Sequence, residues 1–139
     1  MGLYLCTFDT EEEEIDGLEV GSYEYFGIFR ECVNEAVEKS SEWGSICPKI
    51  MLHSDCDGKW TPNECAEIII ELEKIKLLFQ NEQPNQKVIE LKKNILTIYG
   101  INPSNLYDCF VDVDGENLID GLATLCKNAI KSNLEILFQ

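Results

Sequence analysis

The segment from Thr61 to Phe79 constrains the fold most, because it is typical of a helix from its first residue to its last turn. Thr61 is a residue type that caps helix N-termini, Pro62 is favoured at the first helical position, and Glu64 completes a capping box. Apolar residues then recur with helical spacing at Ile68, Leu72, Ile75 and Phe79. The pattern predicts an amphipathic helix with one face against a hydrophobic core.

The rest of the chain alternates between strand-like and helix-like segments. We expect strands at residues 2–8, 46–53, 107–113 and 134–138. We expect helices at residues 23–39, 62–79, 85–99 and 116–131, and a solvated acidic loop over residues 11–21. Helices placed between strands favour parallel pairing, so we predict an α/β fold, with α+β as the alternative. The expected architecture is a single domain over residues 1–139, with a small, partly parallel sheet packed with about four helices.

The last six residues, LEILFQ, have two interpretations. They resemble the recognition sequence of a picornaviral protease as left by a cleaved tag, although Ile136 stands where the engineered version has Val. We favour a native strand.

The charge of the chain is strongly negative, with 26 acidic against 11 basic residues and a formal net charge of −15. Residues 1–42 hold 12 of the acids and only two bases, Arg30 and Lys39. Such a chain is repelled by nucleic acids and by anionic membrane surfaces, so we expect neither as a partner. The charge serves solubility alone, or it attracts a partner protein with a basic surface.

The N-terminal residues and the cysteines indicate a cytoplasmic protein. The start MGLYLCTFD has no basic region before its apolar residues, unlike a signal peptide, and no apolar run reaches membrane-spanning length. Seven cysteines make an odd number and none are spaced as CxxC. We therefore expect reduced thiols, no zinc site and no cofactor.

The stretch His53–Glu64 has the length of an EF-hand calcium loop. Asp55, Asp57 and Glu64 fall at loop positions 3, 5 and 12, and Gly58 falls at position 6. His53 stands at position 1, where calcium needs a carboxylate. Helix capping already explains Glu64, so we interpret the stretch as a structural turn. A calcium site that uses Asp55, Asp57 and Glu64 is the alternative.

A second turn, Asp112–Glu116, repeats the pattern Asp-x-Asp-Gly ahead of a helix. With parallel strands, this turn and the one at Asp55–Gly58 would emerge at the same end of the sheet and present two acidic surfaces to a partner. The acidic loop offers a third group. The candidate partner-binding residues are Glu12, Glu13, Asp55, Asp57, Trp60, Asp112, Asp114 and Glu116.

Catalysis has little support in the sequence. His53 is the only histidine, and Cys56 lies between two aspartates that disfavour a thiolate. No GxSxG motif and no phosphate-binding glycine loop is present. We predict a binding protein and no enzyme.

Several long segments resemble the immunity protein 70 family of bacterial polymorphic toxin systems. They are MLHSDCDGKWTPNEC, NLYDCFVDVDGENL and ILFQ, together with GLYLCTFD and GLEVGSYEYFGIFRECV near the start. The resemblance implies a cytoplasmic protein that binds and neutralises the toxin encoded beside it, and it brings no catalytic residues. We expect direct blocking of the toxin, and a nuclease is our guess for its class. The rival hypotheses are the calcium-binding module and a scaffold with no toxin partner.

Overall fold

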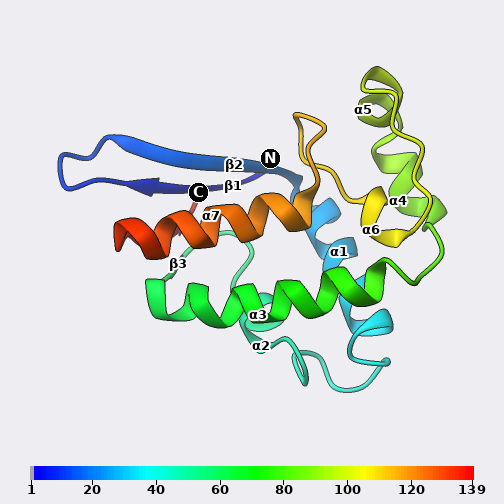
Figure 1. The fold of residues 1–139 in the computed structure, drawn as a ribbon, viewed down its shortest axis with the longest axis horizontal. Coiled ribbons are helices and arrows are strands. Elements are labelled where there is room, and N and C mark those ends of the chain that lie inside the picture. The colour runs from blue at the N-terminus through cyan, green and yellow to red at the C-terminus, as the bar shows by residue number, and fades with distance from the viewer. Residues whose placement is uncertain (1) are drawn as a thin grey trace.

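The computed structural model describes residues 2–139 and shows one antiparallel sheet with helices packed on one face (Figure 1). The strands are β1 (Gly2–Phe8), β2 (Glu14–Ser22), β3 (Lys59–Trp60) and β4 (Ile136–Phe138). The helices are α1 (Tyr23–Ala36), α2 (Pro48–Leu52), α3 (Pro62–Phe79), α4 (Gln86–Leu91), α5 (Lys93–Ile98), α6 (Leu106–Cys109) and α7 (Leu118–Ser132). The fold is therefore α+β.

The sheet has the order β2-β1-β4-β3, and every neighbouring pair is antiparallel. The prediction of a partly parallel sheet is wrong. It assumed strands at 46–53 and 107–113, whereas β1 and β2 form a hairpin and β4 returns between β1 and β3. A hairpin connects its strands in opposite directions, so helices that follow it do not enforce parallel pairing.

Strand β2 lies where a solvated loop was expected. Its acidic residues alternate with Leu18 and Val20, which are buried, so the strand has one core-facing side. The connecting turn is ordered by Asp9, whose Oδ1 accepts the N–H groups of Glu11 and Glu13 at 2.9 Å each. The acidic run is thus held at the tip of a hairpin.

The core lies between the sheet and helices α1, α3 and α7. An aromatic cluster occupies its centre: Phe29 contacts Phe79 and Phe110 with ring centroids 6.1 and 5.2 Å apart. The expected stripe of α3 is buried as predicted, with Ile68, Leu72 and Ile75 at most 1% exposed. The Thr61 capping box is also confirmed, since Thr61 and Glu64 bond each other's backbone N–H.

Two segments that were expected to be strands have other structure. Pro48 begins α2, and the carboxylate of Glu71 accepts the N–H groups of Lys49 and Ile50 at 3.1 and 3.0 Å, which stabilises that helix start. Residues 107–113 form the end of α6 and a single bridge between Val111 and Asn117.

The expected helix boundaries also differ in two places. Helix α1 ends at Ala36 because Lys39 and Ser40 adopt positive φ, and the expected helix 85–99 divides at Lys92 into α4 and α5. None of the helices described for residues 2–139 combines the length and hydrophobicity needed to cross a membrane.

Candidate functional site

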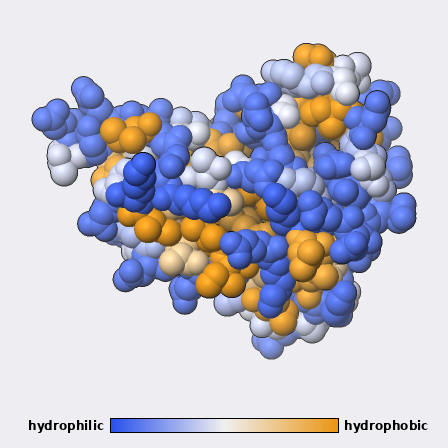
Figure 2. Space-filling view, viewed as in Figure 1, coloured by the Kyte–Doolittle hydropathy of each residue, from blue (hydrophilic) through white to orange (hydrophobic). Residues whose placement is uncertain are grey.

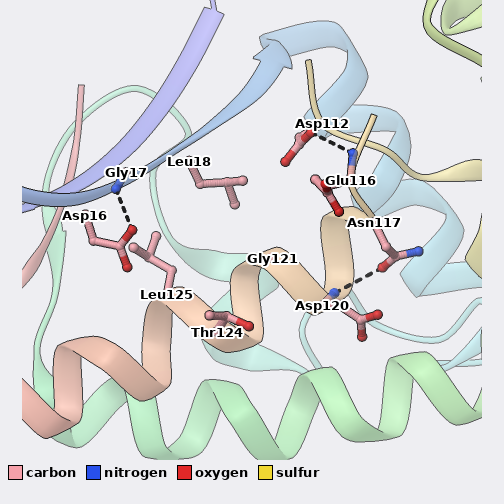
Figure 3. Close-up of a pocket in the computed structure, with 10 residues that line it drawn as sticks. All are labelled: Asp16, Gly17, Leu18, Asp112, Glu116, Asn117, Asp120, Gly121, Thr124 and Leu125. Atoms are coloured by element: carbon pink, nitrogen blue, oxygen red, sulfur yellow. Dashed lines mark hydrogen bonds between the residues drawn. The ribbon is translucent and has the colours of Figure 1, made fainter. Parts of the chain in front are cut away.

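An acidic groove lies between β2 and α7 (Figure 3). It encloses a cavity of about 340 Å³. Its carboxylates come from three segments: Asp16 from β2, Asp112 and Glu116 from the turn before α7, and Asp120 from the first turn of α7. Leu18 and Leu125 supply an apolar floor between them.

Asp112 acts as the organiser of its turn. The residue is 4% exposed, and its Oδ1 accepts the N–H groups of Asp114 and Glu116 at 2.9 and 3.1 Å. Gly115 has φ of +79°, a conformation that favours glycine. The turn thereby exposes Asp114 and Glu116, whereas the buried Asp112 carboxylate is occupied by hydrogen bonds from the backbone of the turn.

The start of α7 fixes the other end of the groove. Asn117 caps the helix by accepting the Asp120 N–H at 3.0 Å. The Asp120 carboxylate accepts hydrogen bonds from Lys76, at 3.0 Å, and from the Tyr107 hydroxyl. The hydrogen bond to Asp120 raises the pKa of Lys76. The pKa of Tyr107 is also raised, mainly by burial and secondly by the Asp120 carboxylate.

One ammonium group compensates part of the acidity on the inner side of the turn. Lys92 is buried, with Nζ 4.1 Å from the centre of the Tyr25 ring. Burial lowers the pKa of Lys92, and the nearby Asp112 and Glu19 carboxylates counteract that effect. Because Lys92 faces inward, the acids on the outer side keep their charge available to a partner.

The turn before α3 is built as a structural element. Glu64 is engaged by the Thr61 backbone N–H at 3.1 Å and lies 3.7 Å from the Lys49 ammonium. The His53 ring stacks on Phe138 with centroids 4.1 Å apart, and its nitrogens contact the carbonyls of Ser54 and Lys59. Of the three carboxylates that the calcium alternative requires, these contacts engage only Glu64.

The side chains of this turn are unequally accessible. Asp57 is exposed and Asp55 is half-buried, whereas Trp60 is 1% exposed and packs edge-on against Phe138 at 4.8 Å. Trp60 supports the sheet from within, so we leave it out of any proposed contact.

The two Asp-x-Asp-Gly turns lie at opposite ends of a helix pair. Figure 1 shows α3 and α7 side by side and running in opposite directions, and Lys76 near the end of α3 contacts Asp120 at the start of α7. About 15 residues of helix therefore separate the turns, which is roughly 22 Å at 1.5 Å per residue. Both turns were expected to emerge at the same end of a parallel sheet. This expectation is wrong, because the sheet is antiparallel.

The groups with catalytic or metal-binding potential are dispersed or engaged. Within residues 2–139, no three carboxylate, thiol or imidazole side chains converge as metal ligands would. Six cysteines are buried, and burial raises the pKa of the Cys32 and Cys47 thiols to about 12. Cys56 is exposed, but it lies in the turn whose histidine is bound to backbone carbonyls.

Sequence reasoning missed Asp16 and Asp120 as members of the groove. Asp120 stands at the third position of α7, where acids are favoured, and this position was the available signal. Asp16 was assigned to a loop. Its place in the groove depends on β2 being a strand and on its contact with Asn128 of α7 at 3.0 Å.

A family model described as immunity protein 70 matches residues 3–138 of the chain. Neither the curated proteins nor the solved structures contain a match. Because the family match spans nearly the whole sequence, the chain belongs to the immunity protein 70 family, which implies a toxin as its partner.

Proposed function

We propose that this member of the immunity protein 70 family binds the toxin encoded beside it one-to-one and neutralises the toxin by covering its functional surface. The family match over residues 3–138 carries this proposal. The structure supports a binding role, because its accessible acids are displayed on ordered elements and its histidine and most thiols are engaged or buried. An ordered surface loses less entropy on binding than a flexible one.

The proposed partner has a basic surface. The net charge of −15 favours such a surface and repels nucleic acids. The candidate contacts that remain accessible are Glu12, Glu13, Asp55, Asp57, Asp114 and Glu116. A nuclease is the toxin class that suits this charge best, because its active site binds a polyanion and an acidic inhibitor can occupy the same site.

The proposed site of action is the cytoplasm of the producing cell, where an incoming or newly made toxin meets the inhibitor. The protein acts there as a single domain, by binding and without catalysis of its own.

Co-expression tests the proposal directly. The toxin gene that neighbours this gene is induced in cells with and without the inhibitor, and survival is measured. We expect protection, a one-to-one complex by size exclusion with light scattering, and no protection against a toxin from another family. If the toxin cleaves DNA or RNA in solution, the inhibitor should stop cleavage at equimolar concentration. Unprotected cells that contain soluble inhibitor would refute the proposed function.

A further inference from the structure

Strand β1 is apolar on both of its sides. Leu3, Leu5 and Thr7 point into the core and are at most 2% exposed. The alternate residues Tyr4, Cys6 and Phe8 point to the opposite side, because successive side chains of a strand alternate. A strand that is apolar on both sides is typical of a sheet that is covered on both faces.

Strand pairing identifies the neighbours on that second side. Cys6 pairs with Gly17 of β2 and with Leu137 of β4, and Leu137 in turn pairs with Lys59 of β3. Tyr4 lies across Gly17, since a Cβ atom built on Gly17 would meet its hydroxyl oxygen at 2.0 Å. The apolar centre of this face is formed by Tyr4, Phe8 and Leu137, which are half-buried, around Cys6, which is buried, and we call these four residues the open sheet face.

No helix covers the open sheet face in the described residues. Tyr4, Cys6, Phe8 and Leu137 lie outside the hydrophobic core cluster and are not among the side chains packed against it. The helices lie on the other side of the sheet in Figure 1, and Figure 2 shows hydrophobic side chains at the surface of the projecting hairpin. Tyr4, Phe8 and Leu137 are thus partly accessible apolar side chains on a sheet face that no described helix covers, and apolar surface with a polar rim is typical of interaction sites.

The rim of the open sheet face is acidic. Burial, together with the neighbouring Glu14 carboxylate, raises the pKa of Tyr4 to about 12. Glu19 pairs with Tyr4 across the strands, and the hairpin tip adds Glu11, Glu12 and Glu13. Residues 2–22 contain no lysine and no arginine. Lys59, on the far strand, is 2.9 Å from Glu135, so the rim offers a net negative field.

We propose that the open sheet face is the contact surface for the toxin, with Tyr4, Phe8 and Leu137 as apolar anchors and the carboxylates of Glu14 and Glu19 as the rim that pairs with basic residues. This proposal rests on the proposed function and adds the location of the interface. A basic protein surface is the occupant that the charge favours. A second copy of the chain would bring two acidic rims together, and like charges across an interface are unfavourable.

The test uses the intact protein and the toxin encoded beside its gene. The double variant Phe8→Thr and Leu137→Thr keeps strand-favouring residues and leaves the core untouched. We expect at least tenfold weaker binding by surface plasmon resonance, mainly through faster dissociation, as for central interface anchors. The matched control is Ile98→Thr on α5, which is 75% exposed and lies away from the sheet; its affinity should stay within about twofold.

Lysine acetylation of the wild-type complex tests the interface without any substitution that could alter folding. Lys59 shares the open face with Leu137 and is accessible, and Lys93 on α5 is exposed. Binding should lower the acetylation of Lys59 severalfold and leave Lys93 unchanged.

The outcomes separate this inference from the proposed function. The wild type could protect cells while the double variant keeps its affinity and Lys59 is acetylated equally in the free and bound protein. That result would contradict the interface assignment but not the proposed function. A wild-type protein that never binds the toxin would remove both. A dimer of this chain that the double variant dissociates would also overturn the assignment.

Discussion

The Tyr25 hydroxyl bonds the backbone of Val111 in both directions: it accepts the N–H at 2.8 Å and donates to the carbonyl at 2.9 Å. The two residues are 86 positions apart, and both are buried. This contact attaches helix α1 to the segment that leads into the acidic turn before α7.

Replacing Tyr25 with Phe should destabilise the protein by about 2–3 kcal/mol, because two buried backbone groups lose their partner. Urea unfolding followed by circular dichroism measures the change. Tyr23→Phe, at a half-buried tyrosine of the same helix, is the matched control and should cost less than about 0.5 kcal/mol. Equal stability of the two variants would contradict the structural role of the Tyr25 hydroxyl.

Glu38→Gln should destabilise the loop between α1 and α2 by about 1–3 kcal/mol at pH 7. The Glu38 carboxylate is buried and accepts hydrogen bonds from the Asn34 side chain and from the N–H groups of Gly44, Ile46 and Cys47. Burial alone would raise the pKa of Glu38, but these hydrogen bonds outweigh it and lower the pKa.

The effect of Glu38→Gln should depend on pH. A carboxyl whose pKa is lowered by folding stabilises the native state above its ordinary pKa and loses that contribution as the pH falls through the lowered value. The difference in unfolding free energy between wild type and Glu38→Gln should therefore shrink between about pH 5 and pH 3. Glu42→Gln, at an exposed acid of the same loop, is the matched control, and a constant difference for Glu38→Gln would contradict the role of its charge.

Neutralising the hairpin tip should slow association with the toxin. Changing Glu11, Glu12, Glu13 and Glu14 to Gln should lower the association rate about tenfold at low salt, because exposed charges steer the encounter. The difference should narrow at physiological salt, where screening acts over about 8 Å. Stopped-flow fluorescence measures both rates.

A control with the same net charge distinguishes steering from total charge. Four exposed helical acids are changed to Gln: Glu31, Glu35, Glu73 and Glu90. This variant should associate faster than the hairpin variant. Identical rates would show that only the overall charge matters.

Cys56 should be the one thiol among residues 2–139 that reacts rapidly with Ellman's reagent. It is exposed, whereas the other six cysteines are buried, and burial raises the pKa of thiols such as Cys32 and Cys47 to about 12. The thiolate is the reactive form. Cys56→Ser should abolish the fast phase, and six further thiols should appear in denaturant. A second fast thiol in the native protein would disagree with the described burial.

The sequence predicted elements whose signals are local. Helix α3 carries its own cap and a regular apolar stripe, so its start and its buried face followed from neighbouring residues. Helix α2 could not be predicted from neighbouring residues, because Glu71, more than twenty positions away, supplies the acceptor for its first N–H groups. Strand β2 was taken for a loop because its exposed side is acidic, and its pairing with the predicted strand β1 is apparent only in the sheet.

The candidate site also contains some residues that local signals in the sequence predicted and others that they did not. Asp112 and Glu116 were predicted because they form a local turn before a helix. Asp16 joins them only because α7 packs along β2, a contact between residues more than a hundred positions apart. The distance between the two acidic turns depended on helix direction, which composition and spacing do not encode.

The position of β4 between β1 and β3 has a consequence for biosynthesis. The 130 residues that follow Phe8, up to Phe138, must be translated before the inner edge of the β1–β2 hairpin finds its neighbour. At elongation rates of about 5–20 residues per second this takes on the order of ten seconds, during which a strand that is apolar on both sides has an unpaired edge. We expect the exposed acidic residues at its tip to disfavour pairing with other nascent chains, because like charges repel. The sheet can thus close only after β4 has been translated, and a nascent chain arrested before β4 would hold the hairpin without the rest of its sheet.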